Sequence, residues 1–500
     1  MRHRNLNLKF AHVIILLAGT SLFSYAQQQL ITIEQALDIA EEFNPRMISS
    51  KLNLERTLFD LEAQRASLKP QFSLNLSPFG YSQNRRFDDT RAQWYTNKSL
   101  ESSGIFRASL PLLLTDGTLA LTNTFGWQDS ETMNQNGTFN NKAFFNNLRL
   151  RYDQPVFTYN RQKMEFKQLE FRYENASISY ALQRLTTEQN ITNQFYLVYM
   201  AQERLTISQA ELENSQRNYE ITKSKVDADL AARNELFQAE VNLATAQSSV
   251  QQRIVALNNA KDNFKQTLGM PLNRDIGVVA DIEIIPMIVD LERAIQSGLA
   301  SRMELRQREI TMEQADLTMI TTKALNEFRG NVSLQMGING DNERFGNIYE
   351  TPTNNPSVSI SLAIPIFDWG EKKARVKAQQ TQQNIAKLNY EEEKVSIELE
   401  VRRTLRNLEN YRTQIDIQEK TVRNAQMTYD LNQVRYREGD IDGMQISQFQ
   451  SQLSSAKISF AQAKIDYKTE LLILKIASLY DFEKDEPIVP AGDLVNLRKK

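Results

Sequence analysis

A change from strand-like to helix-like patterning occurs twice in this chain, each time around a proline. Residues 357–380 read SVSISLAIPIFDWGEKKARVKAQQ, and residues 147–170 read NLRLRYDQPVFTYNRQKMEFKQLE. The two stretches align without a gap and pair Pro155 with Pro365, an offset of 210 positions (365 − 155). Agreement in register over this length predicts a tandem duplication, in which each half builds the same strand-to-helix junction.

The same offset aligns two series of apolar residues that recur every seven positions, as in helices that pack along a seam. The aligned series are Leu236, Leu243, Val250, Leu257 and Phe264 in the first half, and Ile446, Leu453, Phe460, Tyr467 and Leu474 in the second. We therefore predict a first repeat over 27–270 and a second repeat over 271–500 that ends in a C-terminal tail. Long helical hairpins are expected over 158–268 and 368–480.

Four segments alternate apolar and polar residues, which predicts β-strands with one apolar and one polar face. They cover about 71–80 and 145–156 in the first half, and about 331–339 and 357–365 in the second. A length of about nine residues suits a tilted strand that crosses a membrane. A half-buried sheet in a soluble protein is the alternative, but the polar faces are unusually polar and no second layer is evident. Four strands cannot close a barrel, so several chains would share one.

The first half carries an insertion between its two predicted strands. Pro70 and Pro155 are 85 positions apart, whereas Gly330 and Pro365 are 35 apart. The extra segment contains a predicted hairpin over about 104–128 that turns at Asp116 and Gly117. This hairpin either extends the barrel outward as a surface structure or adds strands to it, and we favour the surface extension.

Each predicted strand-to-helix junction carries residues suited to a boundary. Pro155 and Pro365 lack the N–H that a strand ladder uses. Asp368 is a candidate helix cap, with Gly370 beside it and Glu371 placed to complete a capping box. Thr158 is the matching cap in the first half, and no Gly or Pro interrupts Glu371–Glu438.

The first 26 residues are predicted to be a signal peptide for export. They combine a positively charged start, a short apolar core and small residues before a cleavage site after Ala26. A membrane anchor is the alternative, but the apolar core is short for spanning a bilayer. Cleavage would change the net charge from −2 to −5, because it removes three basic residues and no acidic ones. With 59 Lys and Arg against 61 Asp and Glu, the chain does not suggest nucleic-acid binding.

Composition argues against an enzyme and against a cofactor or metal site. The chain has no cysteine, and its two histidines, His3 and His12, both lie in the predicted signal peptide. The mature chain therefore lacks the side chains used in most nucleophilic, general-base and zinc chemistry. No later segment reaches about 18 uninterrupted apolar residues, so a location in a membrane would require a β-barrel.

Four stretches resemble the TolC family of outer-membrane efflux proteins. They are SLAIPIFDWGEKKARVKAQ (361–379), LRYDQPVFTYNRQKMEFKQ (150–168), IEQALDIAEEFNP (33–45) and YREGDIDGMQISQFQSQLSSA (436–456). The resemblance covers nearly the whole mature chain. It implies a mainly α fold with a β-barrel portion, in which a trimer builds a 12-strand transmembrane β-barrel that continues into a long α-helical coiled-coil barrel.

The resemblance also implies the function, the partners and the location. It implies a homotrimeric exit duct in the lipid of the bacterial outer membrane, with a large periplasmic part. Such a duct serves a tripartite efflux or type I secretion system. Its partners would be a periplasmic adaptor (membrane fusion) protein and an inner-membrane transporter of the RND, ABC or MFS type. A periplasmic or surface coiled-coil scaffold or adhesin without a pore is the alternative.

Candidate functional residues lie at the two ends of the predicted duct. Family members often carry two aspartates three positions apart at the periplasmic tip, where this chain has Gln445 and Gln448. Nearby acids are candidates to restore negative charge at this tip or gate: Asp229, Glu235, Asp440 and Asp442. In the barrel, Arg149, Arg151 and Asp153 fall on the polar strand face and are candidates to line the lumen. Ordinary polarity of the barrel wall explains the arginines equally well.

Overall fold

The computed structural model describes residues 29–89, 92–134, 137–280, 282–284 and 287–488. The predicted signal peptide over 1–26 and the last part of the predicted C-terminal tail lie outside the described residues. The chain divides into two units. One comprises Met1–Leu52, Ile178–Met303 and Glu393–Lys500, and the other comprises Asn53–Ser177 and Glu304–Glu392.

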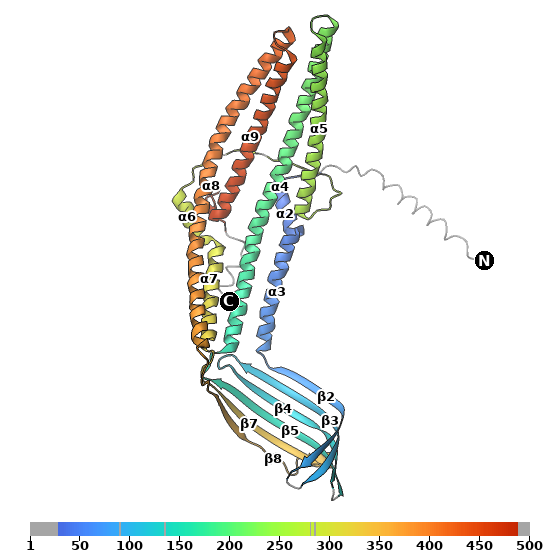
Figure 1. The fold of residues 1–500 in the computed structure, drawn as a ribbon, viewed down its shortest axis with the longest axis vertical. Helices are drawn as coiled ribbons and strands as arrows, with labels where there is room; N and C mark the ends of the chain where they lie inside the picture. Colours follow the sequence, from blue (N-terminus) through green and yellow to red (C-terminus); the bar gives the residue numbers. More distant parts are fainter. Residues whose placement is uncertain (1–28, 90–91, 135–136, 281, 285–286, 489–500) are drawn as a thin grey trace, which may run out of the picture. The chain divides into compact units, whose positions relative to one another are not determined.

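The second unit is built around one antiparallel sheet (Figure 1). Its strands are β2 (Gln71–Asp88), β3 (Gln93–Leu112), β4 (Gly117–Asn134), β5 (Gly137–Val156), β7 (Arg329–Asn342), β8 (Thr353–Asn354) and β9 (Ser357–Ala363). The order is β2-β3-β4-β5-β7, and both β8 and β9 pair with β7. A short 3-10 helix, Phe345–Asn347, lies in the connection from β7 to β8.

Apolar and polar side chains divide between the two faces of this sheet because the strands alternate in register. One line of paired residues across β2 to β5 is Phe72, Ala108, Leu121 and Leu150. The apolar face is uncovered: Phe72 is 69% exposed and Val358 is 71% exposed. Exposed apolar area on this scale marks a surface that contacts lipid or another chain.

Two expectations about the strands are corrected by the structure. The strand expected over 71–80 runs to Asp88, and the one expected over 145–156 begins at Gly137. The inserted hairpin does not stand apart as a surface extension, because β3 and β4 lie in the sheet between β2 and β5. Pairing on both sides satisfies their backbone hydrogen bonds, which an isolated hairpin would leave exposed at two edges.

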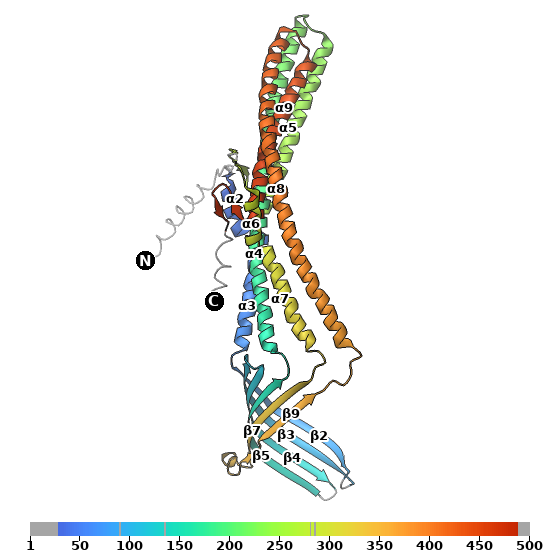
Figure 2. The same cartoon turned by 90° about the vertical axis from the view of Figure 1, so that its left-hand side faces the viewer.

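In the same unit, helices join the strands at one end of the sheet (Figure 2). Segments of α3 (Pro45–Ser67), α4 (Arg161–Asp227), α7 (Met303–Lys323) and α8 (Glu371–Glu438) belong to it. Arg306 of α7 links this helix to α4, since its Nε donates to Glu174 Oε1 at 2.7 Å. Arg306 also pairs with Glu309 and Glu313, so one guanidinium meets three carboxylates.

The first unit is helical and has two main apolar cores. It holds α2 (Ile33–Phe43), α5 (Arg233–Leu268), α6 (Leu291–Ser301), α9 (Gly443–Ser478) and the remaining parts of α4 and α8. One core gathers Phe195, Phe264 and Leu268 around the parallel strand pair β1 (Gln29–Ile31) and β6 (Ile276–Val278). The other gathers Val401, Tyr467 and Leu474 beneath α6. The pair β10 (Tyr480–Asp481) and β11 (Glu486–Pro487) follows α9.

The long helices keep the apolar seam that the sequence predicts. Phe264 of the first series and Leu474 of the second are fully buried. In the described part of the chain, no helix combines the length and the apolarity that crossing a membrane requires.

Candidate functional site

The polar face of the sheet carries a small charged network. Arg151 Nε donates to Asp153 Oδ1 at 3.0 Å, and Ser333 of the neighbouring strand β7 also donates to Asp153. Arg149 lies across Gly337, where a Cβ would be 3.3 Å from the Arg149 Cγ. The structure therefore places the three lumen candidates on one face, with two cations and one anion.

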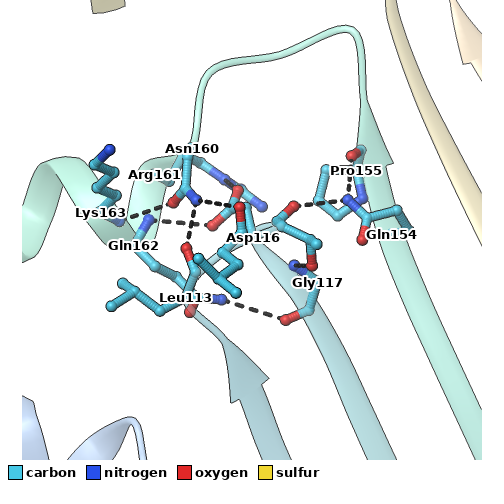
Figure 3. Close-up of polar contacts among 11 residues, drawn as sticks. Leu113, Asp116, Gly117, Gln154, Pro155, Asn160, Arg161, Gln162 and Lys163 are labelled. Carbon is cyan, nitrogen blue, oxygen red and sulfur yellow. Dashed lines mark hydrogen bonds and ion pairs between the residues drawn. The ribbon is translucent and has the colours of Figure 1, made fainter.

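The first strand-to-helix junction is built by the turn of the inserted hairpin, residues 113–116 (Figure 3). Asn160 precedes α4, and its Oδ1 accepts the backbone N–H of Lys163 at 2.8 Å. The same side chain donates from Nδ2 to the Leu113 carbonyl at 2.6 Å. Asn160 thus performs the capping that the sequence assigned to Thr158, because α4 begins at Arg161 and not earlier.

Asp116 fixes this turn to the start of α4, and sequence reasoning read it only as a turn residue. Its carboxylate is buried and accepts the backbone N–H of Gln162 at 3.1 Å and Arg161 Nε at 3.1 Å (Figure 3). A carboxylate at a helix N-terminus pairs with unsatisfied N–H groups and with the positive end of the helix dipole. The hairpin is therefore anchored to the helix and not only to the sheet.

Gly117 and Gln154 complete the anchor. Gln154 Nε2 donates to the Thr115 carbonyl at 2.7 Å. A Cβ at Gly117 would lie 2.7 Å from Gln154 Oε1, so the Gln154 side chain would have to shift if this residue were larger.

The two junction prolines lie where the strand ladder ends. Pro155 pairs with Asn331 of β7, while the pairing of β5 with β4 stops at Asp153. Pro365 follows β9, which ends at Ala363. Proline, which has no N–H to donate, is tolerated at such positions near the end of a ladder.

The second junction uses Asp368 and Gly370. Asp368 accepts the backbone N–H of Gly370 at 3.0 Å and of Lys372 at 3.1 Å. These two bonds stabilise the carboxylate and hold the pKa of Asp368 below its ordinary value. Gly370 has a φ of +84°, which favours glycine. Glu371 does not close the expected capping box, because it forms an ion pair with Arg375 at 2.7 Å.

Each long helical hairpin ends in a turn that contains candidate tip residues. Asp229 has a φ of +55° and its N–H bonds the Val226 carbonyl at 3.1 Å. Asp440 follows Gly439 and donates its N–H to the Arg435 carbonyl at 2.9 Å. Asp229 and Asp440 are both exposed.

Gln445 has a local role that the sequence comparison did not reveal. Asp442 caps α9 by accepting the Gln445 N–H at 2.8 Å, and Gln445 Oε1 accepts the Asp442 N–H at 3.2 Å. This reciprocal pair is a capping box in which Gln serves as Glu does elsewhere. Gln448, one turn later, is exposed.

The two helical hairpins are linked near their tips through Tyr436. Its hydroxyl lies 2.5 Å from Thr222 Oγ1 of α4, and Lys225 Nζ donates to the Tyr436 carbonyl at 2.6 Å. Lys225 also lies over the tyrosine ring, 4.9 Å from its centroid. Burial raises the pKa of Tyr436 above its ordinary value, which favours the protonated hydroxyl that takes part in this hydrogen bond. These long-range contacts carry no signal in the sequence.

A polar cavity of about 420 Å³ lies beside this link. Glu235 and Asp442 line the cavity, together with Tyr436 and Gln450. Asp229 and Asp440 lie in the turns. In the described residues, no cluster of three or more acidic side chains is arranged to hold a metal ion.

Comparisons with known proteins agree with this geometry. Residues 330–477 match the family model of outer membrane efflux proteins. The chain is 20% identical over 263 residues to a probable outer membrane lipoprotein, SilC, of Salmonella typhimurium, and that match covers 51% of this chain and 55% of SilC. It is 23% identical over 370 residues to nodulation protein T of Rhizobium leguminosarum bv. trifolii, covering 73% and 77% of the two chains.

The fold matches solved outer-membrane channels. The Campylobacter jejuni CmeC outer membrane channel superposes with a TM-score of 0.69 at 14% identity, covering 93% of this chain and 88% of CmeC. The aligned part of the chain thus spans about half the length of SilC but most of the length of CmeC. These findings confirm the resemblance to the TolC family of outer-membrane efflux proteins, which consists of channel proteins.

Proposed function

We propose that this protein is the outer-membrane exit duct of a tripartite efflux or type I secretion system. The observation that carries the proposal is the two-faced sheet, apolar and uncovered on one side and charged on the other, with long helices that continue from one end of its strands. An apolar outer face suits lipid, and a polar inner face suits a water-filled lumen. The protein lies in the outer membrane, with a large helical part in the periplasm.

Closure of the wall requires more than one copy of the chain. Among the described residues, β2 pairs only with β3 and β9 pairs only with β7, so the sheet has two free edges. Free edges cannot face lipid, because each unpaired backbone group there costs several kcal/mol. A homotrimer, as the family resemblance implies, closes the wall by pairing β2 of one subunit with β9 of the next.

The helical tips form the periplasmic entrance. In the closed state, the Tyr436 link to Thr222 and Lys225 holds the two hairpins of a subunit together. A periplasmic adaptor that binds the hairpins better in a separated arrangement would open the entrance by shifting this equilibrium. An inner-membrane transporter of the RND, ABC or MFS type delivers the substrate.

Charges along the duct bias its ion preference. Each residue near the threefold axis occurs three times, so Arg149 and Arg151 contribute six cations to the lumen of the trimer. The tip acids Asp229, Glu235, Asp440 and Asp442 attract cations at the helical tips. Replacement of Asp229 and Asp440 with Asn is expected to lower cation preference in planar bilayers. Asp442 is left unchanged because it caps α9.

Membrane extraction followed by mass measurement tests the proposal. We expect the protein to resist release by high salt, to require detergent, and to have the mass of three subunits. Reconstitution in planar bilayers should give discrete conducting states. Release by salt as a non-conducting protein would instead support a coiled-coil scaffold or adhesin and would reject the duct.

A further inference from the structure

The inserted segment contributes two complete strands to the wall. β3 contains 20 residues and pairs with β2 from Gln93 to Ser109, while β4 contains 18 residues and pairs along its length with β3 and β5. Apart from the two-residue β8, the described sheet of one subunit therefore has six strands, β2, β3, β4, β5, β7 and β9. The family resemblance implied four.

The two added strands continue both faces of the sheet. Phe106 and Leu110 of β3 lie in register with Asn123 and Leu119 of β4, on the apolar side. Arg107 pairs with Thr122, which pairs in turn with Arg149 on the polar side. Strands that were only attached to the outside of a finished barrel would not share its division into lipid-facing and water-facing sides.

The added strands are also fixed at the helical end. The buried Asp116 carboxylate bonds the start of α4, and Asn160 bonds the carbonyl of Leu113 in the same turn. The hairpin is thus held on both sides by strand pairing and at its turn by the junction. The hairpin could therefore not leave the sheet without breaking the hydrogen bonds between its turn and the start of α4.

We propose that the barrel of this duct has 18 strands, six from each of three subunits, and that the insertion widens its lumen. This inference rests on the proposed function, because it takes the trimer from there. A hairpin adds an even number of strands, so the direction of β2 and β9 at the free edges is unchanged and both edges remain antiparallel partners for neighbouring copies.

The width of the helical part supports the larger number. A strand spaced ~4.8 Å from its neighbour and tilted by ~40° occupies about 6 Å of circumference, so 12 strands span about 75 Å and 18 span about 113 Å. Four helices leave the sheet in each subunit, and 12 helices at spacings of 8–10 Å span roughly 95–120 Å. With 18 strands the duct does not narrow in the membrane, and it passes solutes as bulky as the helical tunnel admits.

Electron microscopy of the intact trimer in lipid nanodiscs tests the strand number. We expect a backbone diameter of about 36 Å for the barrel, against about 24 Å for 12 strands at the same tilt. A trimer with a barrel of about 24 Å and the hairpin outside it would overturn this inference while leaving the exit duct intact. A particle that is not a membrane-embedded trimer would reject the proposed function itself.

A hairpin deletion sharpens the test. Across the four strands, Arg85 is in register with Thr96, Met133 and Thr138. Replacing residues 87–136 with Asn-Gly therefore joins β2 to β5 by a two-residue turn and keeps every side chain on its face. The variant should remain a trimer whose barrel diameter is smaller by about one third. A trimer of unchanged diameter would contradict the proposal.

Disulfide cross-linking gives a second measurement on the full chain, which contains no cysteine of its own. Cysteines at Thr122 and Arg149, which pair within one sheet, should form a bond inside one subunit and serve as the control. Cysteines scanned over Ser73, Asn75 and Ser77 against Ser357, Ser359 and Ser361 should join different subunits into dimers and trimers on denaturing gels. Edge pairs that bond only within one subunit, or not at all while the control reacts, would contradict closure of the wall between subunits, on which the 18-strand barrel depends.

Discussion

The two repeats differ far more in their strands than in their helices. α4 and α8 contain 67 and 68 residues, and α5 and α9 contain 36 each. In contrast, the first repeat has four strands of 18 to 20 residues, whereas β7 and β9 of the second contain 14 and 7. The helices of the two repeats have therefore kept nearly equal lengths, whereas their strands differ in number and length.

The reason lies in how each element is stabilised. The long helices share an apolar seam with a fixed repeat, so a change of length in one helix would misalign its partners. An antiparallel sheet accepts a whole hairpin between two strands, because the flanking strands keep their direction and their faces. The strand region can therefore change in width while the helical region stays the same.

The largest expected effect comes from adding a methyl group inside the inserted hairpin. A Cβ at Gly126 would clash with the backbone carbonyl oxygen of Ser102 and lie 2.8 Å from Phe145 Cζ. Gly126→Ala is expected to cost about 3 kcal/mol and to reduce the amount of assembled trimer. The control is Gly346→Ala in the second repeat, where no atom lies within 4 Å of the added Cβ. Equal trimer yields for the two variants would show that the hairpin is not tightly packed in the wall.

The two junction carboxylates offer the next comparison. Asp116→Ala leaves the Gln162 N–H and Arg161 without their buried partner and should cost about 2 kcal/mol. Asp116→Asn keeps one acceptor and should cost less. Asp368→Ala, at the exposed second junction, should have the smallest effect of the three. Hydrogen exchange of the first turns of α4 and α8 measures each loss of stability. A larger effect at α8 than at α4 would contradict the prediction that Asp116 contributes more stability than Asp368.

The hydrogen bond between Tyr436 and Thr222 near the helical tips is a smaller difference between the two repeats. At the offset of 210 positions, Tyr436 corresponds to Val226, so only one hairpin provides the hydroxyl. Tyr436→Phe removes the bond to Thr222, worth about 1 kcal/mol, and should raise the open fraction of the entrance about fivefold in single-channel records. Tyr429→Phe is the control, because this buried hydroxyl lacks a hydrogen-bond partner in the described structure. The same increase in both variants would rule out a specific link.

The smallest expected effect is a pH dependence at the second junction. The pKa of Asp368 is lowered by the N–H groups of Gly370 and Lys372, so the folded state favours the carboxylate. The stability that this cap contributes is therefore present above the unfolded-state pKa of about 4 and is lost as the pH falls through the folded-state value. Exchange of the Lys372 amide should speed up, beyond its intrinsic pH dependence, on acidification. Asp368→Asn should abolish that change, and an unaltered profile would contradict the cap.

Sequence patterns predict the elements that bury or expose a continuous apolar face. The Gly- and Pro-free run Glu371–Glu438 coincides with α8, and the hairpin turn at Asp116 and Gly117 lies between β3 and β4. The outer parts of β3, β4 and β5 were missed because polar residues interrupt the apolar alternation there. Cross-strand ion pairs such as Lys98 with Glu131 and Lys142 with Asp129 are found there in place of apolar contacts.

The candidate site was predictable only where it depends on neighbours in the chain. The junction prolines and the Asp368 cap follow from local spacing. Asp116 and Tyr436 act on partners 45 and 214 positions away, so no local pattern marks them. Gln445 illustrates the opposite error, since a difference from the family at this position turns out to complete a helix cap.

The two free edges of the sheet have a consequence for how the duct is made. A single subunit cannot enter the membrane as a finished wall, because its edge groups on β2 and β9 would meet lipid without partners. In the proposed trimer, insertion and assembly must then occur as one event, whose rate rises steeply with the concentration of exported chains. Below a threshold supply of subunits, the cell would hold unassembled chains in the periplasm and no partly formed, leaking pores.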